Sequence, residues 1–328
     1  MPTNLPPNYF KIEERYREAK TNEEKIELLE EMMSVIPKHK GTDHLRADLR
    51  RKLSKHKDAS EARKKTGRQT SVFQIDKEGA GQIAIIGPAN TGKSAFVASV
   101  TNATPEVADF PFTTWQPTPG MMPIDNIQVQ LIDTPALDRE FLEPELLDLF
   151  RRADMILILV DLQAFPFDQL ESSVKILEDV GIIAIDRIDR YPDDRRWYTK
   201  PILVVVNKCD DETYLGDFQV FCELLEGGWS CIPLSAQTGF GLENLQQEIF
   251  NRLNILRVYS KAPGREPDKN SPFVLDIGTT VEEFAGKVHQ DFAAKLKSAK
   301  VWGSSDFDGQ MVSRDYVLED GDIVELKI

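Results

Sequence analysis

Short apolar runs, each ending in polar residues, are spaced along the middle of the chain. They read QIAIIG, IQVQLID, MILILVD, ILVVVNK and CIPLSA. Segments with helical spacing lie between them, including SAFVASV, REFLEPELLDLFRRA, QLESSVKILEDV, FQVFCELLE and LENLQQEIFNRL. Because strands and helices alternate and the strands are apolar on both faces, residues 76–255 are predicted to form an α/β domain, with a mostly parallel sheet covered by helices on both faces. Ligands of such sheets bind at the carboxyl ends of the strands, so the polar residues there are the functional candidates.

The two ends of the chain follow other patterns. Residues 1–75 contain two segments with helical spacing, separated at Pro37, and are predicted to form a helical hairpin or short coiled coil with a polar linker. Residues 256–328 combine strand-like runs with the amphipathic segment TTVEEFAGKVHQDFAAKLKSA, in which Thr280 and Glu283 match a capping box. A strand pair, one helix and later strands indicate a small ubiquitin-like β-grasp domain.

Charge is distributed unevenly along the 328 residues. The net charge is −14, yet residues 38–68 contain twelve Lys or Arg against four Asp or Glu, a local charge of +8. This stretch indicates an anionic partner such as RNA, although a solvated helix face would give the same pattern.

The cysteines and the apolar runs bear on the compartment. Cys209, Cys222 and Cys231 lack metal-like or redox-like spacing, which fits a reducing cytoplasm. We expect neither a signal peptide nor a membrane span, because apolar runs of the required length are missing from the sequence.

The sequence GPANTGKS, Gly87 to Ser94, matches the Walker A pattern between a predicted strand and a predicted helix. Amides of such a loop surround the phosphates of a nucleotide, its lysine reaches the β- and γ-phosphates, and its serine ligates Mg²⁺. The predicted nucleotide contacts in this region are Gly87, Asn90, Thr91, Gly92, Lys93, Ser94 and Ala95.

Two later motifs favour guanine. NKCD ends the strand ILVVV, and the Asp210 carboxylate can accept both N1–H and the exocyclic amine of guanine, a pair of donors that adenine lacks. An ATPase on the same fold is therefore the weaker alternative. SAQTG ends the next strand, where the Ala236 amide would meet the guanine O6. The base contacts predicted here are Asn207, Lys208, Asp210, Ser235, Ala236 and Gln237.

The segments FPFTTWQPTPG and IDTPAL are candidates for sensing Mg²⁺ and the γ-phosphate. Either Thr113 or Thr114 could ligate Mg²⁺, while Asp133 would hold a metal-bound water. Ala136 offers a backbone N–H to the γ-phosphate, but it stands where such loops usually carry glycine. Leu137 stands where Ras-like proteins keep a water-orienting glutamine. The further predicted contacts in these segments are Phe112, Thr134 and Pro135.

The chain resembles the Obg-type GTPases. FPFTTWQPTPG is similar to their switch, and the run from RVYSKAPGREPD to VLEDGDIVELKI is similar to the TGS domain of the developmentally regulated GTP-binding protein (DRG) branch. IPKHKGTDHLRADLRRKL resembles the N-terminal helical region of that branch. The resemblance implies that Thr114 is the Mg²⁺ ligand. It also implies a cytoplasmic GTP switch linked to ribosomes, translation and RNA.

Two departures from the family qualify this expectation. The domain that relatives insert between the strands MILILVD and ILVVVNK is absent or vestigial, and DTPALDREFLEPE contains no glycine.

Hydrolysis itself is open to two interpretations. One is a slow GTPase with Lys93, Thr114 and Ala136 at the reaction, stimulated by K⁺ bound near Asn90; a loop-bracing role for Asn90 is the alternative. The other is a GTP/GDP sensor or RNA-binding regulatory module with negligible turnover. In either case the basic stretch 38–68 is expected to contact RNA or the ribosome, and the acidic TGS unit a protein or ribosomal surface.

Overall fold

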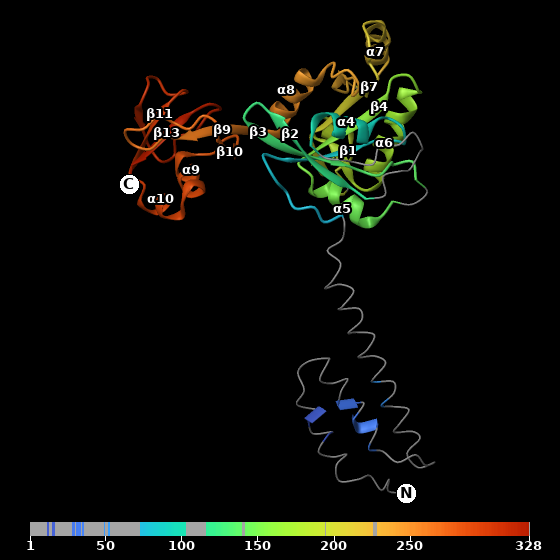
Figure 1. Ribbon diagram of the computed structural model, residues 1–328, viewed down its shortest axis with the longest axis horizontal. Coiled ribbons are helices and arrows are strands. Elements are labelled where there is room, and N and C mark those ends of the chain that lie inside the picture. Colours follow the sequence, from blue (N-terminus) through green and yellow to red (C-terminus); the bar gives the residue numbers. More distant parts are fainter. Residues whose placement is uncertain are drawn as a thin grey trace. The chain divides into compact units, whose positions relative to one another are not determined.

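The computed structural model describes residues 73–102, 116–139, 142–193, 195–225 and 228–327, with eleven helical positions nearer the N-terminus. Contacts divide the chain into two compact units, Met1–Val72 and Phe73–Ile328 (Figure 1). The described positions of the first unit include a buried apolar cluster made by Ile12, Leu28, Leu29, Met32 and Leu49. The predicted N-terminal hairpin and the basic stretch 38–68 otherwise lie outside the described residues. Within the described part of the chain, no helix has the length and apolar character to cross a membrane.

The second unit contains a six-stranded sheet in the order β2-β3-β1-β4-β7-β8. Its strands are β1 Gln82–Ile86, β2 Thr118–Ile124, β3 Ile127–Asp133, β4 Met155–Asp161, β7 Ile202–Asn207 and β8 Cys231–Pro233. β2 pairs antiparallel with β3, while the other neighbours run parallel. The predicted mostly parallel sheet is thus confirmed.

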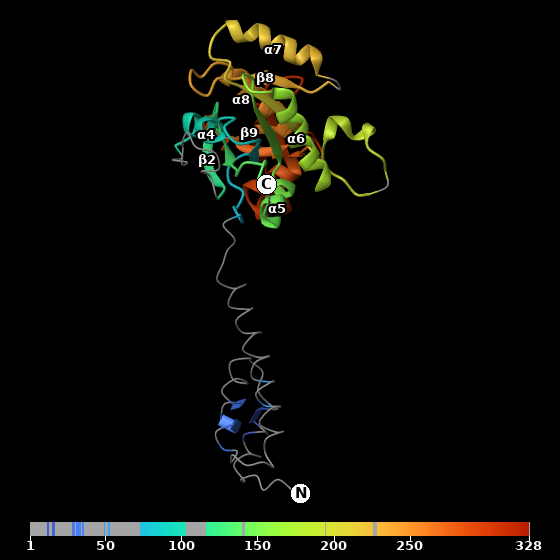
Figure 2. The same ribbon diagram turned by 90° about the vertical axis from the view of Figure 1, so that its right-hand side faces the viewer.

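Helices cover both faces of this sheet (Figures 1 and 2). Alternate residues of β1 belong to two different apolar clusters, one with each helical layer. Ala84 and Ile86 of β1 join the cluster that contains apolar residues of α5, α6 and α7. Ile83 and Ile85 join the cluster with α4 and α8. This two-sided burial explains the continuous apolar runs in the sequence. The helices are α4 Lys93–Val100, α5 Pro144–Arg152, α6 Pro166–Asp179, α7 Thr213–Leu224 and α8 Leu242–Leu253.

Two details differ from the sequence-based expectation. The segment predicted as a helix from Arg139 begins its helix only at Pro144, and α6 begins at Pro166, because proline fits the first turn of a helix. The interval between β4 and β7, in which the resemblance led us to expect an inserted domain to be absent or vestigial, holds α6 and a small unit of β5 Ile182–Ala184, η1 Ile185–Arg190 and β6 Tyr198–Lys200. β5 and β6 pair as a two-stranded parallel sheet.

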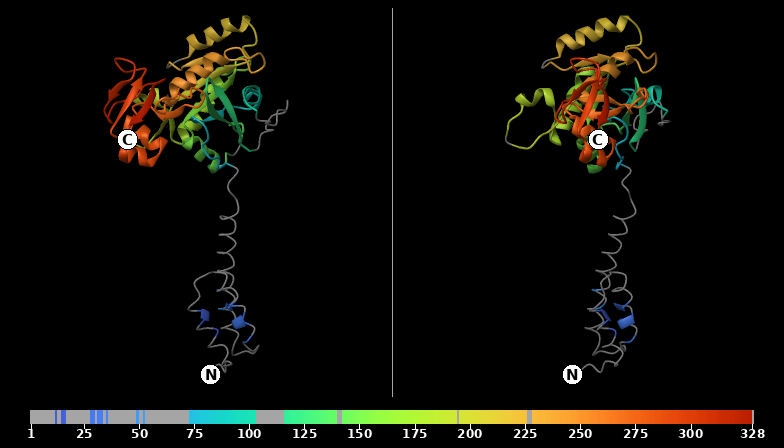
Figure 3. Two further views of the ribbon diagram at one scale, coloured as in Figure 1. Left: turned by 60° about the vertical axis from the view of Figure 1, so that its left-hand side comes forward. Right: turned by 90° about the vertical axis from the view of Figure 1, so that its left-hand side faces the viewer.

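The C-terminal strands form a separate sheet, coloured orange to red in Figure 3. It has five strands in the order β10-β9-β13-β11-β12. The predicted capping box is confirmed, since Thr280 and Glu283 exchange hydrogen bonds at the start of α9. The expected single helix is wrong: the backbone is extended at His289 (φ −168°) and separates α9 from α10. The elements are β9 Ile255–Ser260, β10 Phe273–Asp276, α9 Val281–Val288, α10 Gln290–Lys295, β11 Ser298–Trp302, β12 Gln310–Val312 and β13 Ile323–Lys327.

The turn of the β2–β3 hairpin contacts this C-terminal sheet. Asn126 Nδ2 donates to Tyr259 Oη at 2.7 Å and to the carbonyl of Lys269 at 3.0 Å. Asp125 pairs with Arg257 at 3.1 Å. The two folded regions of the second unit are therefore joined at one end of a hairpin whose other end is Asp133.

Candidate functional site

The loop Gly87–Ser94 joins β1 to α4 and depends on its glycines. Gly87 and Gly92 have φ values of +149° and +91°. A Cβ on Gly92 would lie 2.4 Å from Asn207 Nδ2, and one on Gly87 would lie 2.3 Å from the Leu159 carbonyl oxygen. The close approach of the loop to β4 and β7 therefore requires residues without side chains.

Lys93 is buried at the start of α4 and folds back over its own loop. Its Nζ donates to the carbonyls of Gly87 at 2.9 Å and Pro88 at 2.6 Å. Burial lowers the pKa of Lys93 to about 8, and this outweighs the opposing effect of the Asp133 and Asp138 carboxylates. Because Nζ is bound to two carbonyls of the loop, the amine lies beside the loop amides that would hold phosphates.

Ser94 and Asp133 meet at the ends of α4 and β3. The Ser94 hydroxyl donates to Asp133 Oδ2 at 2.6 Å. Asp133 is fully buried, and burial raises the pKa of its carboxyl group. Among the described residues its Oδ1 atom is buried without a hydrogen-bond partner. A hydroxyl beside an unsatisfied carboxylate oxygen is a donor set that suits Mg²⁺, which prefers oxygen ligands.

The guanine motifs are tied to the phosphate loop through Asn207, which bonds to both Thr91 and Ala236. Its Oδ1 accepts a hydrogen bond from the Ala236 amide at 3.0 Å, and its Nδ2 donates to the Thr91 carbonyl at 2.9 Å. Asp210 Oδ1 accepts from the Ser235 hydroxyl at 2.6 Å. The buried Asn207 side chain thus connects the loop that contains NKCD to the phosphate loop and to the loop that contains SAQTG.

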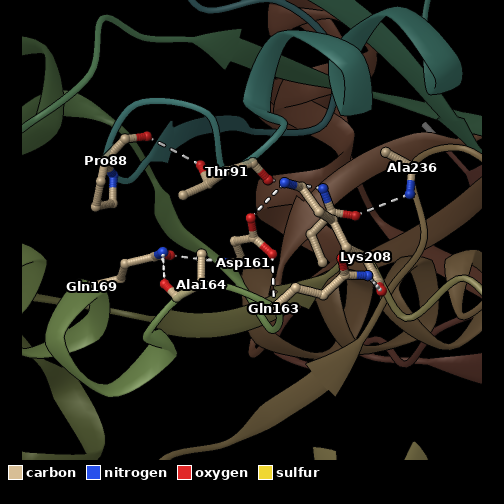
Figure 4. A network of polar contacts seen from close by, with 9 residues as sticks. Pro88, Thr91, Asp161, Gln163, Ala164, Gln169, Lys208 and Ala236 are labelled. Atoms are coloured by element: carbon tan, nitrogen blue, oxygen red, sulfur yellow. Dashed lines mark hydrogen bonds and ion pairs between the residues drawn. The ribbon is translucent and has the colours of Figure 1, made fainter. Parts of the chain in front are cut away.

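Asp161, at the end of β4, is a site residue that the sequence analysis missed. Its buried carboxylate pairs with Lys208 and accepts a hydrogen bond from the Gln163 amide at 2.9 Å (Figure 4). Gln163 in turn donates to the Lys208 carbonyl at 3.1 Å. The rule that polar residues ending strands are candidates would have found Asp161, because it closes the run MILILVD.

The segment after Asp133 is anchored to the phosphate loop. The Leu137 amide donates to the Gly87 carbonyl at 3.1 Å, and the Leu137 side chain is only 2% exposed. Ala136 is not among the residues with positive φ, so this backbone does not demand a glycine there. The Thr134 hydroxyl donates to the Ile85 carbonyl at 2.6 Å.

The structure thus brings together most of the predicted site at the carboxyl ends of the strands. Asn90 (φ +62°) and Gln237 are exposed on their loops, Ala95 lies in the first turn of α4, and Pro135 is buried. Phe112, Thr113 and Thr114 lie outside the described residues, so their predicted contacts stay predictions.

Comparisons with known proteins agree with this geometry. Residues 82–208 match a family described as 50S ribosome-binding GTPase, and residues 256–328 match the TGS domain. A GTP-binding protein of Methanocaldococcus jannaschii is 29% identical over 371 residues, which cover 93% of both chains. Developmentally-regulated G-protein 3 of Arabidopsis thaliana is 26% identical over 92% of this chain and 98% of its own.

A solved structure is similar in fold. The YchF GTPase of Schizosaccharomyces pombe aligns with a TM-score of 0.52 over 77% of this chain and all of its own, at 15% identity.

Proposed function

Since this chain is a P-loop GTPase with a C-terminal TGS domain, we propose that it is a slow, K⁺-stimulated GTP switch of the DRG-like branch that acts with the ribosome or RNA in the cytoplasm. The observation that carries the nucleotide assignment is the Asn207 side chain, which links Thr91 of the phosphate loop to Ala236 of the base loop. This arrangement would hold both ends of a guanine nucleotide in one site, and Asp210 would accept the hydrogen bonds of the base.

Hydrolysis in such a site requires mainly positioning and charge stabilisation. Lys93 would bind the β- and γ-phosphates, and the Ala136 amide would donate to the γ-phosphate. Ser94, Thr114 and, through water, Asp133 would hold Mg²⁺, which neutralises charge on the phosphate oxygens. Leu137, buried in the core, cannot orient the attacking water, and we therefore expect slow turnover in the absence of a partner.

Potassium would supply part of the missing charge stabilisation. Asn90 is exposed in a left-handed conformation at the fourth position of the loop, where its side-chain carbonyl can face a cation beside the phosphates. We expect single-turnover hydrolysis to be several-fold faster in KCl than in NaCl, with Asn90→Ala removing the difference. Equal rates in the two salts would rule out this part of the proposal. A wild-type rate no higher than that of Lys93→Ala would instead favour a non-hydrolysing sensor.

The ribosomal assignment is supported by the family match over residues 82–208 and by the charge of residues 38–68. Binding through such a stretch would be salt-sensitive and directed at phosphate backbones. The test is co-sedimentation with ribosomes and separated subunits in K⁺ buffer, with a GTP analogue or GDP bound. We expect more pelleting with the analogue and a loss of pelleting when residues 38–68 are deleted. Pelleting that is independent of both changes would contradict the proposal.

A further inference from the structure

The carboxylate of Asp138 is bound to a backbone amide of the phosphate-binding loop. Asp138 Oδ1 accepts a hydrogen bond from the Ala89 amide at 3.0 Å. Ala89 is the third residue of the loop, and Asp138 lies five residues after Asp133, in the glycine-free segment. Amides of this loop normally serve phosphate oxygens, so a side-chain carboxylate stands in for a phosphate oxygen here.

The charge of Asp138 also acts on Lys93. Its carboxylate is one of the negative groups that raise the pKa of Lys93 against the effect of burial. Lys93 Nζ donates to the carbonyls of Gly87 and Pro88, which directly precede Ala89, so the lysine and the Asp138 carboxylate lie against the same part of the loop. Lysines of such loops reach the β- and γ-phosphates, so this part is the terminal-phosphate side of the site. A carboxylate and a phosphate group near the same cation repel one another.

The backbone before Asp138 is fixed, while its side chain is free to turn away from the loop. Leu137 anchors the segment through its buried side chain and through its amide, which donates to Gly87. Asp138 itself is exposed. An incoming phosphate would therefore displace one side chain without unpacking the segment, at a moderate cost because the charge is partly screened by water.

We propose that Asp138 determines the preference of this site for GDP over GTP, by competing with the γ-phosphate for the terminal-phosphate side of the loop. On this proposal the phosphates of GDP are held by the loop amides nearer Lys93, so GDP would leave the Asp138–Ala89 contact in place, whereas the γ-phosphate of GTP would have to break it and would add negative charge beside it. The inference rests on the proposed function, since it assumes that the loop holds a guanine nucleotide.

The test is a comparison of Asp138→Asn with the wild type by fluorescence titration. The probes are N-methylanthraniloyl-GDP and the non-hydrolysable N-methylanthraniloyl-GppNHp, with Mg²⁺ present. We expect Asp138→Asn to bind the triphosphate analogue about tenfold more tightly relative to GDP, while the Kd for GDP changes by less than about twofold. Asp148→Asn is the matched control, because Asp148 is an exposed aspartate of α5 that pairs with Arg151 and lies outside the site. We expect this control to keep the wild-type ratio.

A second variant and a salt series keep the test independent of folding defects. Asp138→Ser should lower the ratio of the Kd for the triphosphate analogue to the Kd for GDP, as Asp138→Asn does. Raising the concentration of choline chloride should lower the same ratio for the wild type, because salt screens an exposed charge. An unchanged ratio in both variants would overturn the inference. Unchanged affinities with loss of single-turnover hydrolysis would overturn it as well, and would make Asp138 a catalytic residue. A wild-type protein that binds neither probe would instead refute the proposed function.

Discussion

Leu137 and Lys93 are the residues at which burial most directly determines chemistry. Leu137 lies in the same apolar cluster as Ile86, Ile132 and Leu146, so the position next to Ala136 contributes to the core. Lys93 is buried in the site, and burial lowers the pKa of its amine to about 8. For Leu137 this allows a test of packing against catalysis, and for Lys93 a test of protonation on nucleotide binding.

Replacing Leu137 with glutamine should destabilise the protein without accelerating hydrolysis. A buried amide without partners, together with lost apolar contacts, costs about 2–3 kcal/mol. Urea unfolding of Leu137→Gln measures this loss, and single-turnover hydrolysis measures the rate. Leu137→Met, which keeps the volume, should cost less than about 1.5 kcal/mol. Faster hydrolysis with full stability in Leu137→Gln would show that the side chain can leave the core.

Nucleotide binding should take up protons at alkaline pH because of Lys93. The pKa of Lys93 is about 8 in the folded protein and about 10.5 in an unfolded chain, so between these values the unfolded state binds more protons and stability rises with pH. Phosphates favour the charged lysine, so affinity for GDP should fall from pH 7.5 to 9.5. Calorimetry in two buffers of different ionisation enthalpy detects the proton uptake. Lys93→Arg, which stays charged, should lose it; equal uptake in this variant would assign the proton to another group.

At the scale of elements, the sequence predicted the strands whose burial is two-sided and missed features that its hydrophobic pattern does not show. β4 was recognisable because all seven of its residues are buried. β2 was not, since TPGMMPI contains two prolines and a glycine and becomes a strand only by pairing with β3 along its whole length. The break at His289 was likewise invisible, because amphipathic spacing continues across it. Asp138 carried no motif at all, and only the folded segment brings it to Ala89.

The capping box of α9 gives a test of element stability. Thr280→Ala removes the hydrogen bond to the Glu283 amide, and we expect a loss of about 1 kcal/mol in the stability of the TGS domain. Thermal unfolding followed by circular dichroism measures the effect. Thr280→Ser keeps the hydroxyl and should remain close to wild type, whereas equal losses in both variants would point to packing of the threonine methyl group.

At the scale of the whole second unit, the GTPase and TGS domains meet at the β2–β3 turn. Arg257 donates to Asp125 of the turn and to Asp320 of the TGS domain, which fixes the arginine between them. Asn126 adds its bonds to Tyr259 and Lys269. The contacts that Asp125 and Asn126 make with the TGS domain join residues more than 130 positions apart, so the sequence alone offered no basis for predicting them.

The contact between Asn126 and Tyr259 is expected to hold the two domains together. Asn126→Ala and Tyr259→Phe should each lower stability by about 1 kcal/mol, and the double variant should cost less than the sum, because both remove the same hydrogen bond. Urea unfolding of the four proteins completes the cycle, and limited proteolysis should cut the single variants faster between the domains. Strict additivity would show that the two side chains act separately.

The β2–β3 hairpin is held in a single register along its whole length. Its ladder is continuous from Thr118 opposite Asp133 to Ile124 opposite Ile127. A slip by one residue would carry the turn about 3.3 Å past its TGS partners and would turn the buried Met122 and Ile124 toward solvent. The TGS contacts at the turn and the β1–β3 ladder, in which Ile85 lies opposite Asp133, fix the same register. Damage to the junction would therefore loosen one of the two supports of the strand that brings Asp133 to Ser94.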